Sequence, residues 1–329
     1  MTGVQTCTLP IYGHFLQIGV SIGVILCPND GTDPDQLLRK ADLAMYHAKA
    51  QGRNTYRFFT ERLRTELLER TALLADLKQA ALGEQFMLHY QPIVATRSGE
   101  VHAVEALLRW RHPQRGMINP DTFIPLAERT GLIVPIGQWV IDRALTELSE
   151  LDGQLPGGRP PLRLSVNLSL AQLSDPSLVD WLETSLRAHD LSPHRLELEL
   201  TETALLHDLE HGIEIMRRLK SLGVGLVIDD FGTGHSSLSY LKRFPVEKLK
   251  IDRSFVIGVA SDRDSAAICR AVIGMGRSLG LLLVAEGVEN DADLSFVREQ
   301  GFDFAQGYHY AAAMPAWELR DWLLRRWVS

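Results

Sequence analysis

Acidic and amide side chains close most of the apolar runs in this chain, and their types predict a metal-dependent chemistry. The runs end at Glu105, Asn167, Glu199, Asp229 with Asp230, Lys250, Glu286 and Gln306. Strand ends on one rim of a barrel of mostly parallel strands bring distant residues into one pocket. Carboxylates held close together repel one another, and a divalent cation is the usual remedy. The pattern therefore predicts a metal-dependent enzyme.

The ligand types narrow the choice of metal. Four side chains would offer oxygen ligands from four separate strand ends, namely Glu105, Asn167, Glu199 and Asp229. Because histidine and thiolate are absent from this set, it favours Mg²⁺ or Mn²⁺ over Zn²⁺. Asp229 and Asp230 are consecutive, and neighbours on a regular strand point to opposite faces. Both can face one pocket only where the strand ends, and Gly232 and Gly234 give the backbone that freedom.

The composition is that of a globular protein. With 329 residues, 45% of them hydrophobic, the chain is long enough for one barrel plus a smaller appendage. No apolar stretch approaches the roughly 18 residues of a membrane span, and no signal-peptide layout is present, so we expect a cytoplasmic protein without membrane contact. Three cysteines outside any CxxC pair indicate reduced thiols. A formal charge of −7 argues against a nucleic acid polymer as partner.

The N-terminal part of the chain predicts a small α+β unit. Residues 1–12 fit neither a strand nor a helix that continues into the following segment and resemble translated sequencing-adapter sequence, so we set them apart as an assembly artefact. FLQIGVSIGVIL predicts one strand from Phe15, a helix begins at Pro34 and stops at Gly52, and TYRFF predicts a short strand. Residues 60–82 predict a linking helix. An ordinary first helix packed on the barrel and a signalling coiled coil both fit that segment.

Residues 15–59 resemble the C-terminal part of a GGDEF (diguanylate cyclase type) domain. The resemblance is carried by IGVSIGVILCPNDGTDPDQLLRKADLAMYHAKAQGRNTYRFF. The signature loop, the metal-binding aspartates and the nucleotide-binding half of that family are absent, because they would lie upstream of this chain's start. We therefore expect a truncated remnant over residues 1–59 without cyclase activity.

From about Leu67 to the C-terminus, the chain resembles the EAL-domain phosphodiesterases. The segments that carry this resemblance include FMLHYQPIV, VHAVEALLRWRH, ELTE, DFGTGHSSLSYLKRFP, EKLKID, EGVE and QGY. The family implies an α/β fold, a modified (β/α)8 TIM-like barrel with one antiparallel strand, over residues 67–329. It also implies two-metal hydrolysis of cyclic di-GMP to linear pGpG in bacterial second-messenger signalling, with Mg²⁺ or Mn²⁺ as the two ions.

The resemblance assigns roles to the matched positions. The first metal would be held by Glu105, Asn167, Glu199 and Asp229, and the second by Asp229, Asp230 and Glu286. Catalytic roles would fall to Glu105, Asp230, Lys250 and Glu286, with Lys250 orienting the attacking water and the phosphate. Ligand contacts would come from Gln91, Arg109, Glu289 and Gln306. Glu202 would brace the loop after Asp230, and that loop would form a homodimer interface.

A catalytically weak cyclic di-GMP receptor or interaction module is the alternative, because members of this family can lose metal ligands and still bind. The completeness of the ligand set separates the two functions. Every matched metal, lysine and loop-bracing position keeps the functional residue type, which favours the enzyme. A barrel enzyme for another phosphodiester is a third hypothesis, and the matches at Gln91 and Arg109 favour cyclic di-GMP instead.

Overall fold

The computed structural model of the chain describes residues 7–11, 14–50, 54–81, 83–158, 160–202, 209–232 and 241–328. The contacts divide the chain into two compact units, Met1–Leu77 and Lys78–Ser329. Across the described segments, no helix is both long enough and apolar enough to cross a membrane.

The described residues of the N-terminal unit form two small sheets, one complete helix and most of a second helix. β1 (Cys7–Ile11) pairs antiparallel with β2 (His14–Ile18), and β3 (Ile22–Val24) pairs in parallel with β4 (Tyr56–Phe58). A parallel pair needs a crossover, which α1 (Pro34–Ala50) provides. α2 (Glu61–Ala80) follows. Ala44, Phe59 and Leu63 form a small buried cluster.

One strand prediction for this unit is wrong, and one strand was not predicted. The run from Phe15 does not form one strand but is divided between β2 and β3, because residues 19–21 join neither ladder. Within residues 1–12, Cys7–Ile11 forms the strand β1, which ends before β2 begins. Pairing with β2 satisfies the backbone hydrogen bonds of this segment, and that pairing needs no alternating side-chain pattern.

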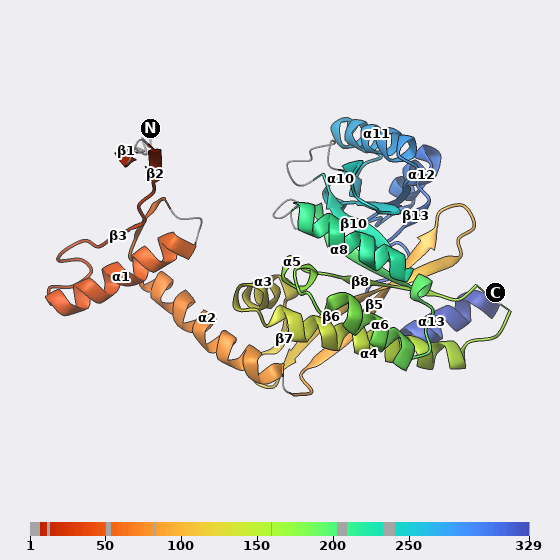
Figure 1. Cartoon of the computed structure of the whole chain (residues 1–329), viewed down its shortest axis with the longest axis horizontal. Coiled ribbons are helices and arrows are strands. Elements are labelled where there is room, and N and C mark those ends of the chain that lie inside the picture. The colour runs from red at the N-terminus through yellow and green to blue at the C-terminus, as the bar shows by residue number, and fades with distance from the viewer. Residues whose placement is uncertain are drawn as a thin grey trace. The chain divides into compact units, whose positions relative to one another are not determined.

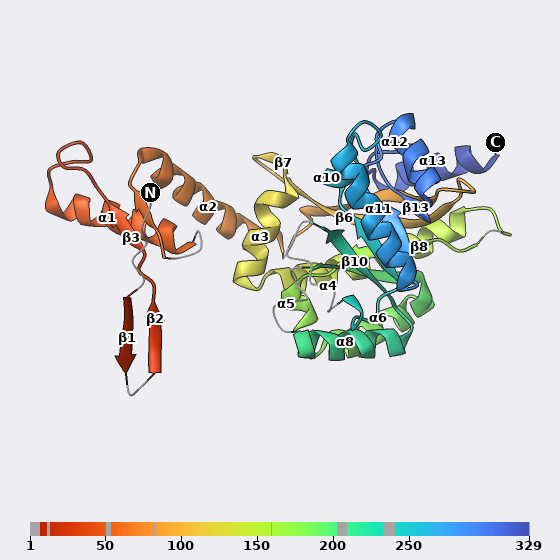
Figure 2. The ribbon, with the colours of Figure 1, turned by 90° about the horizontal axis from the view of Figure 1, so that it is seen from above.

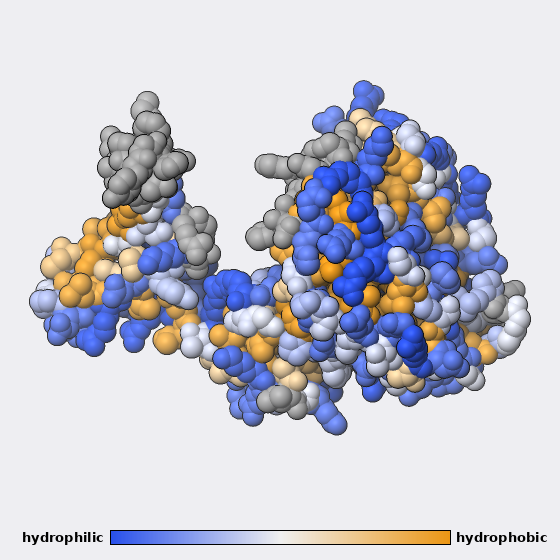
Figure 3. All heavy atoms as spheres, viewed as in Figure 1, coloured by the Kyte–Doolittle hydropathy of each residue, from blue (hydrophilic) through white to orange (hydrophobic). Residues whose placement is uncertain are grey.

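Large apolar side chains are exposed on the N-terminal unit, where hydrophobic spheres gather in Figure 3. Between 50% and 64% of the surface is exposed for Val20, Ile22, Leu26, Leu38, Tyr46, Tyr56 and Phe58. The sheet of β3 and β4 has two strands. Exposed apolar side chains beside unpaired strand edges favour association between chains.

Eight strands of the second unit close into a barrel. In the order of the ring they are β5 (Phe86–Ala95), β13 (Phe304–Ala305), β12 (Leu282–Ala285), β11 (Lys248–Ile251), β10 (Gly225–Phe231), β9 (Leu196–Thr201), β8 (Arg163–Asn167) and β6 (Val101–His112). β5 runs antiparallel to both β6 and β13, whereas the other pairs in the ring are parallel. This topology confirms the predicted barrel with one antiparallel strand. β7 (Gly116–Ile118) extends the sheet beside β6.

Helices surround the ring of strands, as Figures 1 and 2 show. The helical elements are α3 (Pro120–Thr130), α4 (Ile133–Gln154), α5 (Leu170–Leu173), α6 (Leu178–Ala188), the 3₁₀ turn Pro193–Arg195, α8 (Leu209–Leu222), α10 (Arg253–Val256), α11 (Arg263–Ser278), α12 (Asp291–Gln300) and α13 (Ala316–Val328). In α4, Ile136, Val140, Ala144 and Leu148 recur at helical spacing and are buried. Such an apolar stripe is what attaches a helix to the outside of a sheet.

A group of charged and polar side chains, two of them buried, lies at the end of the barrel where the parallel strands begin. In this basal ion layer (His102, Arg163, Glu197 and Lys248), Lys248 Nζ lies 2.6 and 2.7 Å from the two Glu197 oxygens and 2.9 Å from His102 Nε2. Arg163 Nη1 donates to Glu197 Oε1 at 3.0 Å. Strand β10 lies between the strands that carry Lys248 and Glu197. On β10, a Cβ at Gly225 would come within 3.1 Å of Glu197 Cγ, so glycine at this position leaves space for the glutamate side chain.

The protonation state of His102 follows from its hydrogen bond with Lys248. An ammonium only donates hydrogen bonds, so His102 Nε2 accepts from Lys248 and the imidazole is neutral. Burial and the Lys248 charge lower the pKa of His102 to about 4, which agrees with a neutral ring. Lys248 and Glu197 are each only 2% exposed. The layer is therefore a desolvated ion pair with its hydrogen bonds satisfied.

Replacing Lys248 by methionine should destabilise the barrel strongly. The substitution leaves the Glu197 carboxylate buried without its main partner, a change that typically costs about 3–5 kcal/mol in the free energy of unfolding. The double variant Glu197→Leu/Lys248→Met should recover most of that loss, because two apolar side chains then replace both charges. Urea unfolding of the single and double variants measures the difference. A double variant no more stable than Lys248→Met would contradict the pairing.

Candidate active site

The end of β10 turns so that two consecutive aspartates lie on the same side. Asp230 has φ = +53°, Gly232 has φ = +102°, and the register between β10 and β11 shifts between Ile228 and Phe231. Aspartate is one of the few residues with a side chain that tolerate this left-handed region. Carboxylate oxygens of Asp229, Asp230 and Glu286 consequently lie within 4.8 Å of one another. The turn begins at Asp230 itself, before the glycines, and Gly234 lies outside the described residues.

Lys250 lies at the centre of the acidic side chains. Its Nζ is 2.7 Å from Glu199 Oε2, 2.7 Å from Glu286 Oε1, 3.2 Å from Asp229 Oδ1 and 3.4 Å from Glu105 Oε2. The lysine side chain is 1% exposed. With Asp230 beside them, five carboxyl groups surround one ammonium group. The site therefore carries an excess of negative charge whenever these acids are ionised.

Amide groups orient the Glu105 carboxylate. Asn167 Nδ2 donates to Glu105 Oε1 at 2.7 Å, and Gln306 Nε2 donates to Glu105 Oε2 at 2.7 Å. Gln306 Nε2 also lies 2.9 Å from Gln91 Oε1, and Gln91 Nε2 donates to the Ala311 carbonyl at 3.0 Å. Burial opposes ionisation of Glu105, but Lys250 and the two amides outweigh it and lower the pKa of this carboxyl.

Three of the other acids, Glu199, Glu286 and Asp230, have raised pKa values. Burial, followed by the Glu105 charge, raises the pKa of Glu199 well above its ordinary value. Burial raises the pKa of Glu286 to about 8 although Lys250 opposes the shift. Burial and the neighbouring Asp229 raise the pKa of Asp230 to about 6. A single lysine thus does not provide enough positive charge to keep all of these groups ionised at neutral pH.

The donor set fits hard divalent cations. Asp229 Oδ1 and Gln306 Oε1 are buried and have no hydrogen-bond partner among the described residues, although Asp229 Oδ1 is in ion-pair contact with Lys250. The ligating atoms on offer are all oxygen, which Mg²⁺ and Mn²⁺ prefer. Asp229, Asp230 and Glu286 are close enough to share one ion. The full predicted ligand set stays a prediction.

Two cavities flank the acids. One, of about 170 Å³, is lined by Gln91, Glu105, Arg253, Glu286, Glu289, Gln306 and Tyr308 among others. The other, of about 600 Å³, is lined by Arg109, Asn167, Glu199 and Asp230 together with apolar residues of α3 and α4. Lys250 contacts acids that line both cavities. The arrangement suits an elongated ligand whose central part lies over the acids.

The structure brings together most, but not all, of the predicted site residues. Arg109 and Glu289 line different cavities, and Glu289 is exposed. Glu202 is buried directly after β9. The loop that it would brace includes residues 233–240, which lie outside the described residues, as does the predicted dimer contact through that loop.

Three pocket residues were missed by the sequence reasoning. Ser165 contacts Glu199, while Arg253 and Tyr308 line the smaller cavity. Ser165 lies two residues before Asn167, and the period of two along a strand could have placed both on the same face. Tyr308 and Arg253 directly follow QG and KID, and their proximity to those segments was the available signal.

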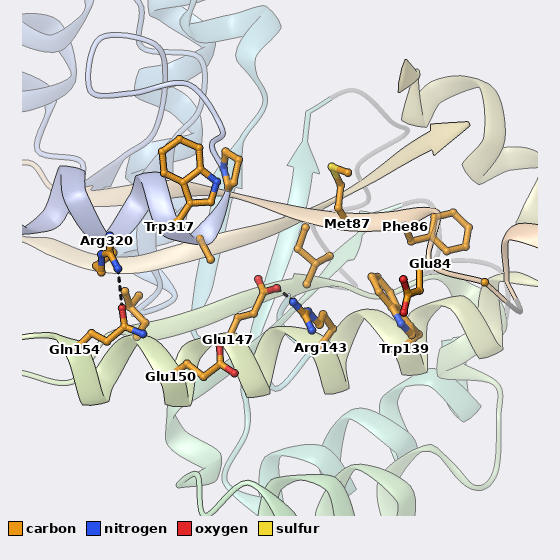
Figure 4. Close-up of a pocket in the computed structure, with 15 residues that line it drawn as sticks. Glu84, Phe86, Met87, Trp139, Arg143, Glu147, Glu150, Gln154, Trp317 and Arg320 are labelled. Carbon is orange, nitrogen blue, oxygen red and sulfur yellow. Dashed lines mark hydrogen bonds and ion pairs between the residues drawn. The ribbon is translucent and has the colours of Figure 1, made fainter. Parts of the chain in front are cut away.

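A separate groove lies on the outside of the barrel, between β5, α4 and α13 (Figure 4). It has a volume of about 750 Å³ and is lined by none of the predicted site residues. Arg143 Nε donates to Glu147 Oε1 at 2.6 Å, and Tyr90 donates to Glu147 Oε2 at 2.7 Å. Because none of the predicted site residues lines the groove, we assign it no catalytic role.

The fold and the acidic rim define a TIM-like barrel protein whose site is built from carboxylates around a lysine. Comparison with known families extends this description. Residues 74–313 match the EAL domain, and residues 3–55 match the diguanylate cyclase, GGDEF domain. The chain belongs to the EAL domain family and carries part of a GGDEF domain before it, which confirms both resemblances. The GGDEF match begins earlier than the predicted start at residue 15.

Several relatives carry functional names. The chain is 46% identical over 306 residues to the bifunctional diguanylate cyclase/cyclic di-GMP phosphodiesterase MucR of Pseudomonas aeruginosa, covering 93% of this chain and 44% of MucR. It is 42% identical to the cyclic di-GMP phosphodiesterase NbdA of the same organism, covering 94% and 39%. The solved PaMucR phosphodiesterase in complex with c-di-GMP is 47% identical with a TM-score of 0.71, covering 75% of this chain and 99% of that one. The chain spans less than half the length of these two curated relatives.

Proposed function

We propose that the barrel hydrolyses one phosphodiester bond of cyclic di-GMP to give linear pGpG. The observation that carries this proposal is the group of five carboxyl groups around the buried Lys250, placed between two cavities at the rim of the barrel. The similarity to the c-di-GMP complex of PaMucR supports the choice of substrate. A role in bacterial second-messenger signalling in the cytoplasm follows from that substrate.

In such a reaction, different side chains would bind the metal ions and orient the phosphate. Glu105, Asn167, Glu199 and Asp229 would hold one divalent ion, and Asp229, Asp230 and Glu286 the other. When bound, two such ions lower the pKa of water and supply positive charge to the phosphate. Lys250 places an ammonium among the same acids, where it orients the phosphate and stabilises charge on the breaking P–O bond.

Other groups position the ligand and the acids. Gln306 and Asn167 donate to the two oxygens of Glu105, which fixes the direction in which this carboxylate presents its lone pairs. Gln91 orients Gln306 in turn. Arg109, at the larger cavity, carries a guanidinium fork suited to two phosphate oxygens. A water oxygen bonds to phosphorus, and the sugar oxygen leaves as a hydroxyl.

An assay of the purified chain tests the proposal. Cyclic di-GMP incubated with the protein and Mg²⁺ should yield pGpG on chromatography. Asp229→Asn should abolish the product, whereas Glu150→Gln, in the outer groove of Figure 4, should leave the rate unchanged. Binding of cyclic di-GMP without any product would reject hydrolysis and support the receptor alternative.

We further propose that the active form is a homodimer through the loop after Asp230. The basis is the family resemblance, since residues 233–240 of this loop lie outside the described residues. Light scattering combined with size-exclusion chromatography should give twice the chain mass. A monomer that hydrolyses cyclic di-GMP at full rate would contradict the proposal.

Deleting residues 1–59 should spare the barrel. The predicted site residues lie between Gln91 and Gln306, within the second unit, whereas residues 1–59 belong to the first unit. The shortened protein should hydrolyse cyclic di-GMP within a few-fold of the full chain and be more soluble, because the exposed apolar side chains between Val20 and Phe58 are gone. Sedimentation and rate measurements at equal concentration check both expectations. A shortened protein that is folded by circular dichroism but inactive would mean that the N-terminal unit helps to build the active form.

A further inference from the structure

Ser165 lies inside the barrel next to the acids, although no part of the proposed mechanism uses it. It is the third residue of β8 and has no exposed surface. In the strand ladders it is level with Glu105 of β6 and with Glu197 of β9. Its position is therefore between the basal ion layer and the acidic rim, on the same side of β8 as Asn167.

The hydroxyl of Ser165 makes one short contact. Its Oγ lies 2.5 Å from Glu199 Oε1, and the bond is buried. The other oxygen of the same carboxylate, Oε2, lies 2.7 Å from Lys250 Nζ. Because a serine hydroxyl has one proton to donate, this bond directs that proton to Glu199. Both oxygens of Glu199 are thus held by named partners, one on β8 and one on β11.

We propose that Ser165 is a positioning residue that fixes the Glu199 carboxylate for metal binding. The inference rests on the proposed function, which places Glu199 among the metal ligands. A carboxylate with only one oxygen fixed can rotate about its last side-chain bond, whereas the second hydrogen bond selects one orientation. Partners of this kind, which orient a ligand without touching the metal, typically contribute about 10–100-fold in metal affinity.

The size of Ser165 is part of the same role. A larger side chain at this position would enter the space shared by Glu105, Glu199 and Lys250, all of which are buried. Alanine keeps the small volume and removes only the hydroxyl. Ser165→Ala therefore separates the hydrogen bond from the packing.

A direct Mn²⁺ titration of the full chain tests the assignment. Free Mn²⁺ is counted by electron paramagnetic resonance in the absence of substrate, so the readout does not depend on turnover. Ser165→Ala should bind Mn²⁺ about 10–100-fold more weakly than the unchanged protein. Its turnover should recover as Mn²⁺ is raised, because the defect is in binding. Ser185→Ala is the matched control, since that serine is also buried and donates to Asp142 Oδ1 at 3.1 Å in the helical layer.

A double variant shows whether Ser165 affects Mn²⁺ binding through Glu199 or through a general effect on the protein. In Glu199→Ala, adding Ser165→Ala should change the Mn²⁺ affinity no further, because the oriented group is already absent. Ser165→Cys, whose thiol is a weaker donor, should show a reduced affinity and carries the test if the alanine variant does not fold. Unchanged affinity in either folded variant, or additive losses with Glu199→Ala, would overturn the assignment. Failure of the unchanged protein to bind Mn²⁺ would instead reject the metal-dependent function itself.

Discussion

Hydrolysis of cyclic di-GMP should be present with Mg²⁺ or Mn²⁺ and absent with EDTA or Ca²⁺. The offered ligands are oxygen atoms of Glu105, Asn167, Glu199, Asp229, Asp230 and Glu286, clustered around Lys250. Without divalent ions, the excess carboxylates would repel one another and an anionic phosphate as well. Ca²⁺ has a larger radius and looser geometry, so it should occupy the site without aligning the attack. Hydrolysis rates measured in parallel with Mg²⁺, Mn²⁺, Ca²⁺ and EDTA check this prediction.

The stability of the protein gives an independent readout of the same site. An ion that binds the folded chain raises its melting temperature by mass action. Mn²⁺ should therefore stabilise the unchanged protein and should stabilise Asp229→Asn less, because Asp229 belongs to both predicted ligand sets. Full turnover in the presence of EDTA would defeat the prediction, even if Mn²⁺ still raised the melting temperature.

The barrel was predictable because the sequence pattern that indicates it recurs along the chain. Each parallel strand is a short apolar run that ends in a functional side chain, and this repetition does not depend on any single motif. The antiparallel direction of β5 came from the family resemblance, because a run such as FMLHYQPIV contains nothing that distinguishes the two directions. The catalytic role of Lys250 was predicted from the same resemblance, whereas its central place among the acids comes from the structure.

The parts that were missed depend on distant partners. Ser165 is important for its neighbour Glu199, which lies 34 residues away in the sequence, and an isolated serine in an apolar run carries no signal of that contact. The basal ion layer joins Lys248 of β11 to Glu197 of β9 and to His102 of β6. Only the closure of the barrel shows that these charges are buried. β1 was missed for a related reason, since its pairing with β2 is a backbone property.

Lys250→Ala should lower the catalytic rate by a factor on the order of 10² or more, as expected for the loss of a positioned charge-stabilising group. The ammonium lies 2.7 Å from both Glu199 and Glu286, so it is the positive group nearest to where charge develops. Binding of cyclic di-GMP should be largely intact, because Gln91 and Arg109 remain. Binding is measured in Ca²⁺, where no turnover is expected, and the rate is measured in Mg²⁺.

The same substitution should lower the stability of the protein more without divalent metal than with it. Removing Lys250 leaves buried carboxylates without their shared cation, so the metal-free variant should melt at a lower temperature than the unchanged protein. Divalent ions can replace the lost charge, so much of that difference should disappear in Mn²⁺. Lys78→Ala, at an exposed lysine of α2, is the control and should change neither rate nor melting. Equal losses of binding and rate in Lys250→Ala, persisting in Mn²⁺, would make Lys250 a structural residue and remove it from the mechanism.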